Sequence, residues 1–98
     1  MYMSRDIMHC KPGKVKDMVG KFKKMSEIFV RKGFPKLRIY TDLSGEHYWT
    51  VIVEQEVEDI GKMDEMARQA MADKDFVDVM AGYHDLVQSG RRELYRVE

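Results

Sequence analysis

The stretch His47-Tyr-Trp-Thr-Val-Ile-Val-Glu-Gln-Glu-Val57 decides the fold of this chain. It is rich in β-branched and aromatic residues, which favour a β-strand. Because side chains alternate along a strand, its residues divide into two faces. The apolar face consists of Trp49, Val51, Val53 and Val57. The opposite face is amphipathic and consists of Tyr48, Thr50, Ile52, Glu54 and Glu56. Both faces therefore carry apolar surface that has to be covered.

A second strand precedes this one. Residues 36–42 alternate with period two, which puts Leu37 and Ile39 on one face and Arg38, Tyr40 and Asp42 on the other. Residues 43–46, Leu-Ser-Gly-Glu, have the composition of a tight turn. We therefore expect strands 36–42 and 47–57 to form a β-hairpin.

A strand and a long helix come before the hairpin. Residues 2–9 contain no Gly or Pro and predict a first strand, although the pattern does not show which face points inward. Pro12 suits the first turn of a helix, and Gly33 followed by Pro35 ends one. The spacing predicts a helix from about 12 to about 32, with an apolar stripe formed by Val15, Met18, Val19, Phe22, Met25 and Phe29.

A broken helix and a last strand follow the hairpin. Asp59 is a suitable N-cap for a second helix whose stripe runs from Met63 to Met71. The apolar phase is interrupted at residues 73–75, and a third helical segment is expected over 76–87, ending before Gly90. Residues 91–97 predict the final strand, with Leu94 on one face and Tyr95 and Val97 on the other.

This order of elements predicts one α+β domain over residues 1–98 with ferredoxin-like βαββαβ topology. Right-handed crossovers place both helices on the same face of a four-stranded antiparallel sheet. The other sheet face would carry Tyr40, Tyr48, Thr50, Ile52, Tyr95 and Val97, with Arg38 and Glu54 among them. An apolar patch of this kind is more than a monomer ordinarily exposes, so we expect an identical sheet to cover it in a homodimer.

The element order, the sequence His9-Cys10-Lys11-Pro12-Gly13-Lys14 after the first strand and the hairpin residues 45–51 resemble the dimeric α/β-barrel superfamily of ferredoxin-like proteins. The resemblance is greatest to antibiotic-biosynthesis monooxygenase-like and NIPSNAP-like members. It implies a ligand cavity between sheet and helices or within the barrel. In several members it also implies oxygenation of an electron-rich aromatic substrate without metal or flavin.

Five residues are candidates for the lining of such a pocket: Arg38, Tyr40, Tyr48, Thr50 and Glu54. They would bind a small apolar or aromatic ligand through a few polar groups in an apolar setting. The alternative interpretation is that the tyrosines are interface aromatics with their hydroxyls at a wet edge.

His84 is the candidate for a catalytic base, since an imidazole titrates near neutral pH. The alternative is that it favours the terminal carbonyls of a helix. The three histidines and the single cysteine, Cys10, match no metal-binding pattern, so no metal or other cofactor is expected. Haem-degrading relatives use an asparagine, and this chain has none.

Composition excludes several other classes. The net charge is zero, although residues 1–49 carry +6 and residues 50–98 carry −6. The lysines of the first helix are expected to face the acidic helical region, so nucleic-acid binding is not expected. No apolar run is long enough for a membrane span or a signal peptide, and Cys10 has no partner for a disulfide. We expect a cytoplasmic protein without a membrane partner.

Two functions remain. The first is a small-molecule-binding dimeric α/β-barrel protein, with cofactor-independent monooxygenase-like activity as its enzymatic form. The second is a non-catalytic homodimeric module whose aromatic sheet face serves only assembly. A cavity of about 300 Å³ or more favours the first, because ligand sites start near that size.

Overall fold

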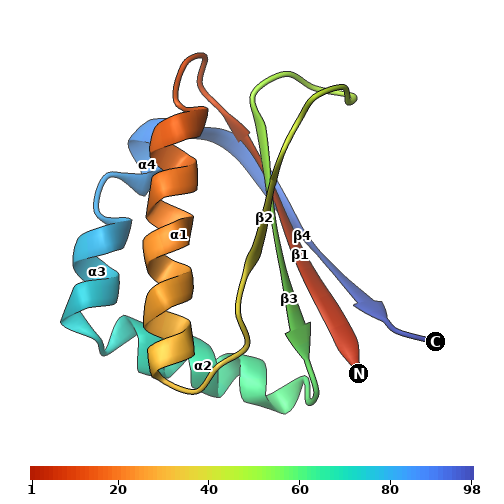
Figure 1. Cartoon of the computed structure of the whole chain (residues 1–98), viewed down its shortest axis with the longest axis vertical. Helices are drawn as coiled ribbons and strands as arrows, with labels where there is room; N and C mark the ends of the chain where they lie inside the picture. The colour runs from red at the N-terminus through yellow and green to blue at the C-terminus, as the bar shows by residue number, and fades with distance from the viewer.

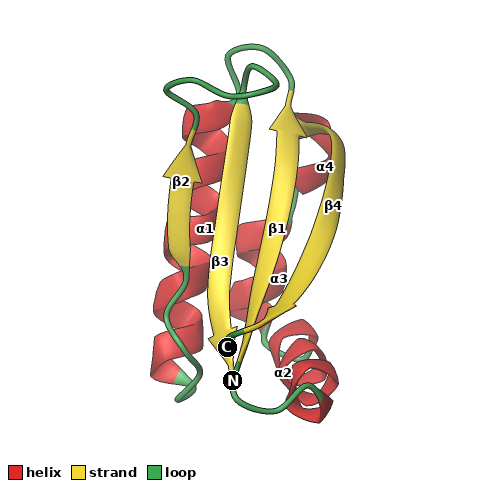
Figure 2. Ribbon diagram, turned by 90° about the vertical axis from the view of Figure 1, so that its right-hand side faces the viewer, coloured by secondary structure: helices red, strands yellow, loops and turns green.

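Four antiparallel strands form one sheet in the order β2-β3-β1-β4. The computed structural model describes residues 1–98. It gives the strand bounds β1 Tyr2–Cys10, β2 Arg38–Thr41, β3 Thr50–Val57 and β4 Val87–Arg96. All helices lie on one side of the sheet (Figure 1), and nothing in the chain covers its other face (Figure 2). The predicted ferredoxin-like α+β arrangement is confirmed.

The pairing of β1 settles which of its faces points inward. Met8 lies opposite Val51 of β3, and both are buried in the core beneath the helices. Ile7 lies opposite Ile52 and therefore belongs to the other face. The even-numbered residues of β1 thus point toward the helices.

Helix α1, Val15–Arg31, packs against the half of the sheet formed by β2 and β3 (Figure 2). Met18 is completely buried, and Phe22 and Met25 follow it on the same stripe, so the predicted apolar face is confirmed. The helix begins three residues later than predicted because Gly13, with φ of +78°, cannot belong to a right-handed helix. At the other end Gly33 has φ of +81° and forms the predicted left-handed stop.

The hairpin is less regular than its sequence suggested. Predicted strand 47–57 begins only at Thr50, since Trp49 has φ of +59° and turns the chain. The Asp42 carboxylate accepts a hydrogen bond from the Thr50 backbone N–H at 2.8 Å, which closes a loop longer than the predicted turn over 43–46. Tyr48 and Trp49 therefore belong to this loop, and their predicted assignment to sheet faces was wrong.

Three helices make the second crossover: α2 Gly61–Met71, α3 Lys74–Met80 and α4 Tyr83–Leu86. The predicted break near 73–75 is confirmed, and Asp73 caps α3 by accepting from the N–H groups of Asp75 and Phe76. The third segment predicted over 76–87 is divided again, because Gly82 has φ of +83°. The last strand starts at Val87 rather than at 91, and Gly90 lies inside it, opposite Met8.

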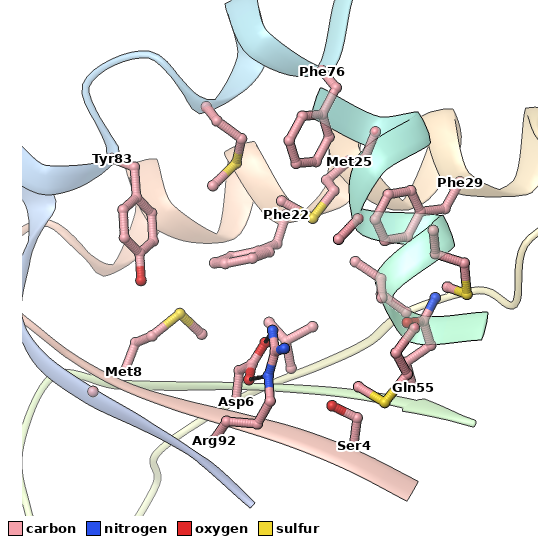
Figure 3. A pocket seen from close by; sticks show the side chains of 18 of the residues that line it. Ser4, Asp6, Met8, Phe22, Met25, Phe29, Gln55, Phe76, Tyr83 and Arg92 are labelled. Carbon is pink, nitrogen blue, oxygen red and sulfur yellow. Dashed lines mark hydrogen bonds and ion pairs between the residues drawn. The ribbon is translucent and has the colours of Figure 1, made fainter. Parts of the chain in front are cut away.

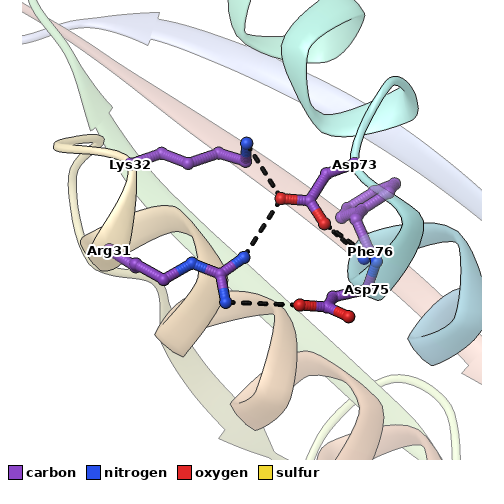
Figure 4. Close-up of polar contacts among 5 residues, drawn as sticks. All are labelled: Arg31, Lys32, Asp73, Asp75 and Phe76. Carbon is purple, nitrogen blue, oxygen red and sulfur yellow. Dashed lines mark hydrogen bonds and ion pairs between the residues drawn. The ribbon is translucent and has the colours of Figure 1, made fainter.

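A cluster of ion pairs joins the end of α1 to the start of α3 (Figure 4). Asp73 Oδ2 lies 2.9 Å from Lys32 Nζ and 3.0 Å from Arg31 Nη2, and Arg31 Nη1 lies 3.4 Å from Asp75. At this end of the helix, the compensation predicted between the basic and acidic halves is confirmed. The cluster therefore links the C-terminal end of α1 to the start of α3. No helix is both long enough and apolar enough to span a bilayer.

Candidate functional site

A cavity of about 680 Å³ lies between the helical layer and the sheet. Helices α1, α2 and α3 supply its roof, and strands β1, β3 and β4 supply its floor (Figure 3). Of its 22 lining residues, 15 are hydrophobic. Ligand sites are typically mostly apolar cavities of about 300–1,000 Å³ with a few polar groups, and this cavity has that character.

The roof is built from aromatic rings and methionines. Phe29 of α1 stacks on Phe76 of α3, with ring centroids 6.0 Å apart and planes 7° from parallel. Phe22 meets Tyr83 edge to face at 6.4 Å. Helix α2 adds Met63 and Met66, whose flexible side chains adapt to irregular ligands. This roof suits an aromatic or aliphatic body.

The floor carries an ion pair. Asp6 of β1 and Arg92 of β4 lie directly opposite each other in the sheet and point toward the helices. Arg92 Nε donates to Asp6 Oδ1 at 2.6 Å, and Nη2 donates to Oδ2 at 3.1 Å. This is the two-pronged geometry that gives arginine–carboxylate pairs their strength. The Asp6 contact raises the pKa of Arg92, so its guanidinium stays charged.

Tyr83 supplies a hydroxyl at the side of the cavity. Its ring is half-buried, and the hydroxyl points inward without a hydrogen bond to the other residues drawn in Figure 3. Burial, followed by the nearby charge of Asp6, raises the pKa of Tyr83. The phenol therefore stays protonated at neutral pH and can donate a hydrogen bond to a ligand.

None of the five residues proposed from the sequence lines this cavity. Arg38, Tyr40 and Glu54 lie together on the open face of the sheet, on neighbouring strands. Thr50 is buried where β3 starts and donates to the His47 carbonyl at 3.0 Å, whereas Tyr48 lies exposed on the loop. The structure thus brings three of the five together. Their role in ligand binding stays a prediction.

The open face holds a polar network that the sequence did not reveal. Arg5 Nε donates to Glu54 at 2.7 Å, and the same guanidinium lies over the Tyr95 ring at 5.4 Å. The Tyr95 hydroxyl donates to Glu93 at 2.8 Å. Burial favours the neutral form of Glu54, but the adjacent Tyr40 hydroxyl and Arg5 outweigh it and lower the pKa of Glu54.

The histidines do not gather at one place. His84 is exposed on α4, packs against the Tyr83 ring at 5.3 Å and does not line the cavity. His9 and His47 lie together elsewhere, with ring centroids 4.4 Å apart. Burial, with the charges of His47 and Arg91, lowers the pKa of His9. No group of three or more His, Cys, Asp or Glu side chains is placed to hold a metal ion.

Asp6 and Arg92 were not predicted from the sequence. The pattern of residues 2–9 does not show which side chains point toward the helices, and nothing near Arg92 in the sequence indicates that it pairs with Asp6. The signal in the sequence was a carboxylate among the apolar residues of the first strand. That signal becomes specific only when the strand register is known, since a shift of one residue turns every side chain to the other face.

Comparison with known proteins bears on the fold. No family model and no curated protein matches the sequence. An uncharacterised NIPSNAP domain protein from Burkholderia xenovorans superposes with a TM-score of 0.81 at 13% identity, over 100% of this chain and 95% of that chain. A NIPSNAP family protein from Agrobacterium tumefaciens gives 0.83 at 11% identity, over 99% and 85%.

A third solved structure, an antibiotic biosynthesis monooxygenase, gives a TM-score of 0.75 at 13% identity, over 100% of this chain and 99% of that one. The resemblance inferred from the sequence is thus confirmed at the level of the fold. This chain has the ferredoxin-like α+β fold that NIPSNAP-domain proteins and an antibiotic biosynthesis monooxygenase also have.

Proposed function

We propose that this chain binds a small, largely apolar or aromatic molecule in the cavity between its helices and its sheet. The observation that carries the proposal is the cavity itself, about 680 Å³ with a mostly hydrophobic lining. The cavity opens to solvent, since its lining residues Ala67, Met71 and Arg92 are exposed, so a ligand has a path of entry. A cavity that large, with Asp6, Arg92 and Tyr83 converging on it, has the character of a binding site.

We propose further that the protein acts as a homodimer joined through the open sheet face. Tyr40 and Tyr95 are 42% and 47% exposed there, beside the half-buried Ile52. Several charged residues of this face are already paired within the chain, Arg5 with Glu54 and Arg91 with Glu93, whereas Arg38 has no ion pair within the chain. Their burial against a second copy would therefore leave few polar groups without partners. Within this proposal, Arg38, Tyr40 and Glu54 belong to the interface or to the barrel interior beneath it.

If the protein is an enzyme, the activity we propose is oxygenation of the bound molecule. It is supported by the fold shared with an antibiotic biosynthesis monooxygenase. An electron-rich phenol would take one oxygen atom from O₂ and become a quinone. The second oxygen atom would leave as water with the hydroxyl hydrogen and one ring hydrogen of the substrate. Asp6 is the carboxylate in the cavity that would receive the phenolic proton first, without a metal or flavin.

Binding is tested by calorimetric titration of the purified protein with 2-naphthol. We expect saturable binding that Ala67→Trp weakens strongly, because Ala67 lines the cavity from α2 and an indole there would obstruct it. Ala72→Trp is the matched control, since Ala72 is also exposed but lies outside the cavity. Equal affinity in both variants would place any binding elsewhere and overturn the cavity as the site.

The enzymatic form is tested with an oxygen electrode and 1,5-dihydroxynaphthalene. Protein-dependent O₂ consumption that Asp6→Asn abolishes supports oxygenation, and His84→Ala tests the predicted role of that histidine. Saturable binding without O₂ consumption would leave the protein a binder. Failure of wild-type protein to bind either naphthalene, together with a stable dimer, would favour the non-catalytic homodimeric module.

The dimer is tested by sedimentation velocity. Tyr40→Asp would bury an unpaired charge in the interface and should give a monomer. Tyr48→Asp makes the same chemical change on the exposed loop, away from the sheet face, and should leave the dimer intact. A monomeric wild-type protein at micromolar concentration would contradict the proposal.

A further inference from the structure

We propose that the Asp6–Arg92 ion pair makes the cavity select uncharged ligands. Asp6 neutralises the guanidinium of Arg92, which would otherwise bind an anion. This inference rests on the proposed function, because it concerns the ligand class that the same cavity accepts. It makes Asp6 and Arg92 specificity-determining residues.

The geometry of the pair is the first argument. Both oxygens of Asp6 are engaged by Arg92, through Nε at 2.6 Å and Nη2 at 3.1 Å. Asp6 thus occupies one of the two edges through which a guanidinium binds a carboxylate or phosphate in two-pronged fashion. An anionic ligand would either displace Asp6 from that edge or bind the remaining Nη1–Nη2 edge, and in both cases it would lie close to the negative charge of Asp6. A cationic ligand would meet Arg92 in the same way.

The remaining charged groups do not alter this balance. Arg91 also borders the cavity, but its Nε donates to Glu93 at 3.0 Å on the open face of the sheet. Tyr83 is neutral, because burial and Asp6 raise its pKa. The cavity thus has one carboxylate and one guanidinium that cancel each other, and no free charge to attract an ion.

The free hydrogen-bonding positions suit a neutral polar group. Arg92 Nη1 makes no contact with Asp6 and is available to donate, while the Asp6 oxygens retain lone pairs that can accept. The Tyr83 hydroxyl is a second donor, under the aromatic roof. A hydroxyl or a carbonyl on an aromatic body would satisfy these groups without breaking the ion pair.

The position of the pair is the second argument. Its side chains are 30% and 63% exposed, and ion pairs of such exposure add little to the stability of a fold. Yet the pair occupies facing positions on the helix-directed side of the sheet, where apolar side chains such as Met8 and Val53 otherwise pack. Charge selection at the cavity explains this placement better than stability does.

The experiment uses three probes on the same ring system: 2-naphthol, 2-naphthoate and the ammonium form of 2-(aminomethyl)naphthalene. Calorimetry at low salt measures their affinities for wild-type protein, Asp6→Asn, Arg92→Gln and the double variant. Circular dichroism confirms that each variant is folded. We expect wild-type protein to bind the naphthol at least tenfold more tightly than either ion.

The variants should move selectivity in opposite directions. Asp6→Asn leaves Arg92 unpaired, so the ratio of naphthoate affinity to naphthol affinity should rise at least tenfold. Arg92→Gln should favour the ammonium probe in the same way, and the double variant should again prefer the naphthol. Because Asp6→Asn and Arg92→Gln test the ion pair independently, the experiment remains decisive if one of these two variants does not fold.

The two proposals fail in distinguishable ways. Wild-type protein that binds naphthoate as tightly as naphthol, or single variants with unchanged selectivity, would overturn the ion-pair inference while leaving the cavity a binding site. Absence of binding by all three probes to wild-type protein and to every variant would overturn the proposed function, and the inference with it.

Discussion

Gly90 of β4 is expected to be intolerant of even one added methyl group. It lies opposite Met8 on the central strand β1. A Cβ built on it would lie 3.0 Å from the Ile7 carbonyl oxygen and 3.5 Å from Met8 Cγ. The Met8 side chain can move, but the Ile7 oxygen belongs to the backbone of a strand that is paired on both sides. Gly90→Ala must therefore strain the pairing of β1 with β4.

The magnitude follows from two opposing effects. An alanine restricts the unfolded chain and so favours folding by about 0.4–1 kcal/mol at a site that accepts it. Crowding a well-packed site typically costs about 1–3 kcal/mol. The free energy of unfolding should therefore fall by up to about 2.6 kcal/mol, with about 1 kcal/mol as the central expectation. For a domain of this size, each kcal/mol lowers Tm by about 4–8 °C.

Gly20→Ala is the matched control, because the same change should act with the opposite sign. Gly20 lies inside α1, and an added Cβ would have nothing within 4 Å. Alanine is favoured over glycine in a helix interior by about 1 kcal/mol, so Tm should rise by about 4–8 °C. Urea and thermal unfolding followed by circular dichroism, at one fixed protein concentration, measure both changes. A Gly90→Ala protein as stable as wild type would refute this reasoning.

Three further predictions concern other positions. Ser26→Ala should lower the free energy of unfolding by about 1–3 kcal/mol. The buried Leu37 N–H donates to Ser26 Oγ at 3.0 Å and would lose its acceptor. An unchanged urea midpoint would contradict this prediction. Asp73 has a pKa of about 2, lowered chiefly by the Lys32 hydrogen bond, against an ordinary value of 3.8. Its stabilising contribution is therefore present above about pH 4 and is lost as the pH falls toward 2, so Asp73→Asn should flatten the fall in urea midpoint over that range. Burial raises the pKa of the Cys10 thiol, so native protein should react slowly with iodoacetamide at pH 8 and unfolded protein rapidly; fast labelling of the native state would show that the strand end opens.

The element order could be predicted because each helix and strand leaves a local pattern. The stripe with Met18, Phe22 and Met25 is helical whatever surrounds it, and Gly33 stops that helix by its own backbone preference. Residues 50–53 are four consecutive β-branched side chains, which favour a strand. The fold class followed from the order of these elements.

Boundaries were predicted less well where a tertiary contact or a single backbone angle decides them. Strand β3 starts later than predicted because Trp49 has a positive φ and the Asp42 carboxylate accepts a hydrogen bond from the Thr50 N–H. Hydrophobic periodicity indicates neither feature. The third helical segment was predicted as continuous because Val79, Met80 and Tyr83 keep the helical spacing across Gly82. The left-handed Gly82 divides it nonetheless.

By itself, the sequence determined which segments are helices and strands, and that the sheet has apolar side chains on both faces. Only the tertiary structure decided where a ligand could bind. Asp6 and Arg92 are 86 residues apart, and no local pattern joins them. They meet because the pairing of β1 with β4 puts them opposite each other on the helix-facing side. Register is a property of two strands together, and a shift of one strand by one residue would put the two charges on opposite faces of the sheet.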